Sequence, residues 1–170
     1  PGLLADIAGA LTLAGLRVLS AQAFTTDDGL ALDAFEVAGA FELEIAEERW
    51  RRFRSTLRHA LEGRVDVADR ILRLRQHYRP AATGVEVKVR VDQDASDYFT
   101  VVEVGAADRM GLLFDLARAF ADTGVDVHSA KVATYGPRVV DVFYVTTGEG
   151  QKLDESSTEA LSAALRSAVG

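Results

Sequence analysis

The chain has 170 residues, of which 48% are hydrophobic and 26% are charged, a composition typical of a globular protein. Its formal net charge of −7 argues against nucleic-acid binding, and no apolar run reaches the roughly 20 residues of a membrane-spanning helix. The absence of Cys excludes disulfides and thiol chemistry, and residues 1–15 lack the basic segment of a signal peptide, so we expect a cytoplasmic protein.

The first elements predicted along the chain are a helix and a hairpin. Apolar residues at helical spacing predict a helix that ends before Gly15, which stands where helix C-termini favour glycine. These apolar residues are Leu3, Leu4, Ile7, Ala8 and Leu11. Strands are predicted over 16–25 and 30–38, on either side of the turn sequence TDDG. A second helix is predicted over 46–62.

The middle of the chain predicts one further helix and one strand. Residues 65–78 have a helical pattern that Pro80 ends, and 84–91 alternate as a strand, which we assign as the fourth strand of the first half. Ten arginines lie between residues 49 and 79. Such a run is either a solvated helix face or a docking surface for an acidic partner.

The second half repeats the first with a strand added in front. Its predicted elements are a strand over 98–106, a helix that starts at the sequence DRMGLL, strands over 125–135 and 139–147, and a helix over 156–169. Ser156 and Glu159 have the spacing of a capping box at the start of the last helix.

An internal repeat relates the two halves. Residues 1–25 aligned without gaps on 110–134 are identical at 11 of 25 positions, which indicates duplication. The second copy has the order β-α-β-β-α of a ferredoxin-like unit. We therefore predict an α+β fold of two ferredoxin-like βαββαβ domains. The first covers residues 1–92, carries an extra helix at 65–78 and lacks its opening strand; the second covers 98–170. We expect the missing strand upstream of Pro1 or borrowed from elsewhere.

The second copy resembles an ACT domain, a βαββαβ module that binds small molecules, mostly amino acids, and regulates an attached enzyme. The motifs that carry the resemblance are DRMGLL at 108–113, the run from Ala130 to Thr134, and DVFYV at 141–145. Met110 departs from the usual proline of this family, which the first copy keeps in PGLL at 1–4.

The tandem order and the junction VRVDQDASDYFTVVEV also resemble the carboxy-terminal ACT pair of bifunctional uridylyltransferase/uridylyl-removing enzymes. Enzymes of that family modify the nitrogen-regulatory PII protein in response to glutamine. The resemblance implies a glutamine-sensing module that controls the catalytic domains of a longer nucleotidyltransferase. A non-sensing interaction or dimerisation module is the alternative.

The resemblance places a ligand site at the turn before the helix of the second copy. The implied ligand-binding residues are Asp108, Arg109, Met110, Gly111, Leu112 and Asp126. A helix N-terminus attracts an α-carboxylate, a glycine lets it approach the backbone, and two carboxylates suit an ammonium group. Alternatively Asp108 is only a helix cap, Gly111 only allows close packing, and Asp126 is a solvated strand residue. Arg17 replaces Asp126 in the first copy, which favours the second copy as the binding one.

Catalytic, metal and cofactor sites are not expected. The chain has no GxSxG, HExxH, P-loop or GxGxxG motif, and its three His residues are dispersed. Asp92, Asp94 and Asp97 lack the glycine and distal Glu of a calcium loop. Both faces of the strand at 139–145 are largely apolar, and helices cover one face of this fold. The other face is therefore expected to meet the other ACT domain, a second subunit or the catalytic domains.

Overall fold

The computed structural model describes residues 2–25, 31–39, 44–77 and 84–170. The helices are α1 (Leu3–Leu13), α2 (Glu47–Leu61), α3 (Val67–Arg75), α4 (Leu112–Asp122) and α5 (Glu155–Val169). The strands are β1 (Leu16–Thr25), β2 (Ala31–Gly39), β3 (Lys88–Asp92), β4 (Thr100–Ala107), β5 (Val125–Tyr135) and β6 (Arg138–Thr147). The predicted α+β class is confirmed, and the predicted turn at 26–29 lies outside the described residues.

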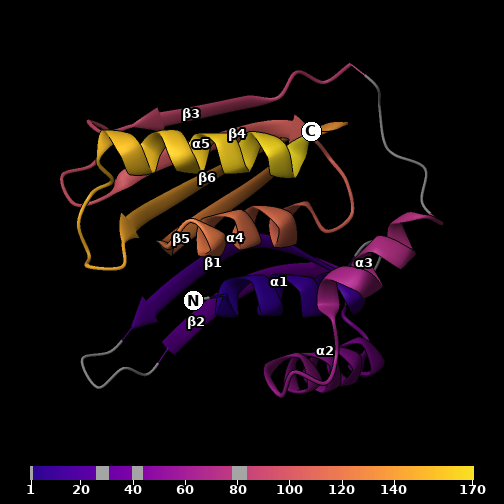
Figure 1. Ribbon diagram of the computed structural model, residues 1–170. Helices are drawn as coiled ribbons and strands as arrows, with labels where there is room; N and C mark the ends of the chain where they lie inside the picture. The colour runs from indigo at the N-terminus through magenta and orange to yellow at the C-terminus, as the bar shows by residue number, and fades with distance from the viewer. Residues whose placement is uncertain (1, 26–30, 40–43, 78–83) are drawn as a thin grey trace.

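The six strands form one antiparallel sheet in the order β2-β1-β5-β6-β4-β3. The two copies meet where β1 pairs with β5, with Ala21 opposite Ala130. Helices α1, α4 and α5 lie across one face of this sheet, and α2 and α3 lie beside α1 at one end (Figure 1). Within the described residues β2 is an edge strand, whereas its repeat counterpart β6 has β4 on its second edge.

The core lies between the sheet and the three helices that cover it. Alternate residues of β6 face this core, among them Val139, Phe143 and Val145, each at most 3% exposed. Val140 and Val142 on the opposite face are only half-buried. No helix within the described ranges is both long and apolar enough to cross a membrane.

The placement of β3 differs from the prediction for 84–91. The strand pairs with β4 of the second copy, with Val89 opposite Val104, so its assignment to the first copy is wrong. The intervening turn explains the pairing, because Asp92 Oδ1 accepts hydrogen bonds from the Asp94 and Ala95 amides at 3.0 and 2.9 Å. A short closed turn costs less entropy than a return to the first copy. The division of the chain at residues 92 and 98 stays a prediction.

The start of the last helix also differs from its prediction. Helix α5 begins at Glu155, and its N-cap is Asp154, whose side chain accepts a hydrogen bond from the Ser157 amide at 2.7 Å. Ser156 therefore lies inside the first turn and is not the capping residue.

Candidate functional site

The turn between β4 and α4 contains the predicted ligand-binding residues. Its N-cap is Gly111, which has a left-handed φ of 71°, and no side chain caps the helix. Asp108 is therefore not a helix cap, which removes the simpler interpretation of this residue. The Asp108 amide donates instead to the Pro137 carbonyl at 2.9 Å, so the turn is tied to the β5–β6 hairpin.

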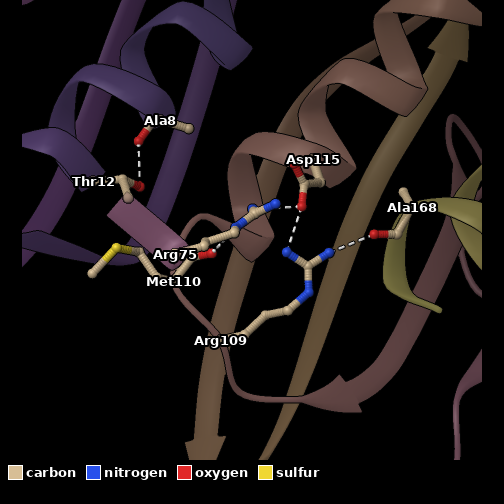
Figure 2. A network of polar contacts seen from close by, with 7 residues as sticks. All are labelled: Ala8, Thr12, Arg75, Arg109, Met110, Asp115 and Ala168. Carbon is tan, nitrogen blue, oxygen red and sulfur yellow. Dashed lines mark hydrogen bonds and ion pairs between the residues drawn. The ribbon is translucent and has the colours of Figure 1, made fainter. Parts of the chain in front are cut away.

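A network of two arginines and one carboxylate holds the turn. Arg75 on α3 donates from Nε to the Met110 carbonyl at 2.8 Å and from Nη2 to Asp115 Oδ2 at 2.6 Å. Arg109 also donates to Asp115 Oδ2, and its other terminal nitrogen donates to the Ala168 carbonyl on α5. Figure 2 shows the two guanidinium groups converging on one carboxylate. The network thus joins α3, the turn, α4 and α5.

Arg75 is a site residue that sequence reasoning missed. The sequence signal was only its place in an arginine-rich helix, where most side chains face solvent. The side chain of Arg75 is 28% exposed, against 74% for Arg73 on the same helix. Only the packing of α3 against the second copy distinguishes the two arginines.

The space beside Gly111 is filled by α3. A Cβ atom added at Gly111 would lie 2.8 Å from Arg75 Nη2 and 2.8 Å from Ile71 Cγ2. In this structure Gly111 therefore allows close packing of another helix against the turn, which was one of the two alternatives left open. The approach of a ligand to the backbone of Gly111 from this side is closed.

A second carboxylate lies near Asp108 and was also missed as a site residue. Asp141 on β6 faces the helix-covered side of the sheet and is 1% exposed. Burial, with a smaller contribution from the charge of Asp108, raises the pKa of Asp141 to about 7, against the opposing effect of a backbone hydrogen bond from Ala133. Within the described residues Asp141 Oδ1 has no hydrogen-bond partner. The available sequence signal was an acidic residue among apolar neighbours in the DVFYV motif.

Asp126 does not lie with the rest of the predicted set. The end of β4 is level with Tyr135, because Ala107 pairs with Arg138 and Arg138 pairs with Tyr135. Asp126 lies nine positions before Tyr135 on β5, which corresponds to roughly 30 Å along the strand. The side chain is exposed. Asp126 and the 108–112 turn therefore belong to opposite ends of the sheet.

The remaining predicted residues have structural positions at the turn. Met110 contributes its backbone carbonyl to Arg75, and Leu112 is a core residue at 5% exposure. Neither observation concerns a ligand, so any part that the two residues play in binding stays a prediction.

A cavity of about 440 Å³ adjoins the equivalent turn of the first copy. Residues from α1, α3 and α4 line it, including Gly2, Asp6, Arg118 and Asp122. Burial raises the pKa of Asp6, and the charge of Arg118 opposes that shift. In the part of the chain that the structure describes, a Cβ atom added at Gly2 would have no neighbour within 4 Å, in contrast to Gly111.

Among the described residues, no group of three or more His, Asp or Glu side chains is placed to hold a metal ion. His128, on β5, contacts Thr146 Oγ1 through Nε2 at 2.8 Å.

The architecture defines an α+β module in which two ferredoxin-like copies share one antiparallel sheet. Residues 100–166, from β4 to α5, match the ACT domain family, so this part of the chain is an ACT domain. Over nearly its whole length the chain is homologous to the C-terminal region of bifunctional uridylyltransferase/uridylyl-removing enzymes.

Three relatives illustrate this similarity. The enzyme of Ruegeria pomeroyi is 37% identical over 171 residues, and that of Rhodospirillum rubrum is 40% identical over 178 residues; each alignment covers 99% of this chain and 19% of the relative. The enzyme of Novosphingobium aromaticivorans is 41% identical over 160 residues, which cover 92% of this chain and 17% of the relative. The chain thus spans about a fifth of the length of these relatives. No solved structure matches it.

Proposed function

We propose that the chain is the amino-acid-sensing regulatory module of a uridylyltransferase/uridylyl-removing enzyme that modifies a PII protein, and that its ligand is glutamine. The family match of residues 100–166 and the similarity of the whole chain to regions of such enzymes support this proposal. The chain itself acts as a regulator, and catalysis belongs to other domains of the longer enzyme. The cytoplasmic location expected from the sequence is part of the same proposal.

The observation that carries the sensing proposal is the chemistry of the β4–α4 turn. Asp141 is a buried carboxylate with an unpartnered oxygen, and its electrostatic coupling to Asp108 brings two acidic groups to one place. The N-terminus of α4 adds helix-end amides and a positive dipole. A zwitterion fits this combination, because its ammonium group can bind the acids while its carboxylate binds the amides. Asp141 takes the role that we had predicted for Asp126.

Calorimetric titration of the folded chain with L-glutamine, L-glutamate, L-asparagine and glycine tests the proposal. We expect saturable heat when glutamine is added to the unsubstituted chain. Asp108→Asn should lower the affinity for glutamine about tenfold or more, because a charged hydrogen-bond partner is lost. Asp126→Asn should leave the affinity unchanged. A loss of affinity with Asp6→Asn instead would move the ligand to the cavity of the first copy. No heat with any of these amino acids would contradict sensing by this chain.

The open face of the sheet favours one second candidate, an interaction module. Phe99 lies 5.1 Å from His128 and 6.2 Å from Tyr144 between ring centroids, and these rings form a half-buried aromatic cluster on the side without helices. A scaffold built on this face would self-associate. The substitution Val142→Glu would abolish this self-association, and Asp108→Asn would leave it unchanged. Light scattering of the two variants separates it from a sensor.

A further inference from the structure

The last turn of α3 lies over the proposed ligand-binding turn of the second copy. We propose that α3 is a latch: its C-terminal end closes the 108–112 turn in the structure described here and has to lift before an amino acid can bind there. This inference rests on the proposed function, since it concerns the regulation of the same site.

The contacts of Arg75 and Ile71 establish the closure. Arg75 bonds the Met110 carbonyl and the Asp115 carboxylate, and Ile71, at 1% exposure, occupies the space beside Gly111. Ligand atoms approaching Gly111 would meet both side chains, so binding and closure compete for one volume.

The two copies differ in what lies beside the glycine that begins the first helix. Gly2 is the repeat counterpart of Gly111, and both glycines begin a helix with positive φ. Among the described residues, nothing lies within 4 Å of a Cβ built at Gly2, and a cavity adjoins it. The second turn is closed by α3, which lies outside the repeated unit.

Helix α3 is attached so that its two ends differ. At its start Val67 is buried against Gly9 on α1, where a Cβ atom would lie only 2.3 Å from Val67 Cγ1, and Asp66 caps the helix. Near its end Ile71, at 1% exposure, and Arg75 provide the contacts to the turn. Opening of the turn has to release Ile71 and Arg75, and Val67 can remain in place as the pivot.

Opening leaves the charges of the turn balanced. Asp115 accepts hydrogen bonds from both Arg75 and Arg109, so Arg109 remains paired with it when Arg75 leaves. A buried carboxylate stripped of its only partner would oppose opening strongly. The duplicated pairing makes a reversible latch physically reasonable, and departure of Arg75 frees the Met110 carbonyl at the mouth of the turn.

Substitution of Arg75 tests the latch, with Arg73 as its matched control. Arg73 lies on the same helix, and its side chain pairs with Asp69 in an exposed i,i+4 ion pair. If Arg75 keeps the binding-competent state scarce, Arg75→Gln tightens L-glutamine binding about three- to tenfold, because the apparent dissociation constant scales inversely with the competent fraction. Arg73→Gln should leave the apparent dissociation constant for L-glutamine unchanged. Titration calorimetry measures both.

Hydrogen exchange followed by mass spectrometry provides the second measurement and does not need a ligand. We expect faster exchange at residues 71–76 and 109–113 in Arg75→Gln and unchanged exchange there in Arg73→Gln. In the unsubstituted chain, glutamine should accelerate exchange at 71–76. Circular dichroism verifies that each variant remains folded.

The outcomes separate the latch from the proposed function. Weaker or unchanged glutamine binding in Arg75→Gln overturns the latch while sensing stands, since Arg75 would then contact the ligand directly or play no part. If no variant binds an amino acid, the proposed function fails, and hydrogen exchange in Arg75→Gln alone tests the latch. Faster exchange confined to residues 71–76 and 109–113 then supports the latch, and unchanged exchange overturns it. Binding by Arg75→Gln alone supports the latch but contradicts sensing by the unsubstituted chain.

Discussion

Asp141 on strand β6 and Asp108 in the β4–α4 turn interact electrostatically although they are 33 positions apart, since burial and then the Asp108 charge raise the pKa of Asp141. Burial is the larger cause of the shift. The neutral form of Asp141 is therefore the one that the folded protein favours below about pH 7.

The stability of the protein should fall as the pH rises from about 4 to 7. The pKa of Asp141 is about 7 in the folded chain and near the ordinary 3.8 when unfolded, so the folded state binds more protons in this range. A shift of this size is worth up to about 4 kcal/mol in the free energy of unfolding. Urea denaturation at pH 4 and pH 8 measures the difference. Asp141→Asn should flatten the profile, and an equally steep profile in that variant would assign the dependence to other groups.

Glutamine binding should strengthen with pH through about 7 and should release protons. A ligand ammonium group beside Asp141 favours the ionised carboxylate, so binding lowers its pKa from about 7. Calorimetry in buffers of different ionisation enthalpy detects the released protons. Proton uptake on binding, or an affinity independent of pH between 6 and 8, would contradict the role of Asp141.

Gly111→Ala should destabilise the protein more than Gly124→Ala. Both glycines have φ near 70°, so both substitutions carry the conformational cost of about 1–2 kcal/mol. At Gly111 the new methyl group meets Ile71 and Arg75, whereas at Gly124 no atom of the described residues lies within 4 Å of it. Overpacking adds about 1–3 kcal/mol. Equal changes in the free energy of unfolding would mean that α3 does not pack against the turn.

Arg109→Ala should loosen the end of α5. Arg109 donates to the Ala168 carbonyl and to Asp115, and hydrogen bonds of charged groups are worth about 1.5–3 kcal/mol. We expect a loss of about 1–2 kcal/mol in stability and faster amide exchange over 166–169. Arg118→Ala is the control, since its ion pair with Asp122 is exposed and should contribute little. Similar effects of both substitutions would argue against the bridge to α5.

Asp154→Ala should fray the first turn of α5, and Ser156→Ala should not. The Asp154 side chain accepts the hydrogen bond from the Ser157 amide, whereas Ser156 lies within the helix. Thermal unfolding followed by circular dichroism compares the two variants. A lower melting temperature in Ser156→Ala alone would restore the capping box predicted from sequence.

Local patterns were sufficient for the elements but not for every pairing. Helical spacing and strand alternation predicted the helices and strands that carry the repeat, because period and turn residues are properties of neighbouring positions. The strand at 84–91 was recognised and then assigned to the wrong copy. Its partner depends on the closed turn after Asp92, whose side-chain hydrogen bonds are not visible in an alternation pattern.

The sequence by itself determined the duplication, the α+β class, the ACT resemblance and the DRMGLL turn, since all of these are encoded in local periodicity and motif. Only the tertiary structure decided which side chains share that turn. It brought Arg75 and Asp141 to the turn and left Asp126 about 30 Å along the strand direction, at the other end of the sheet. The physical reason is that helix packing and strand direction bring together residues from distant segments, and neither follows from the spacing of residues along the chain.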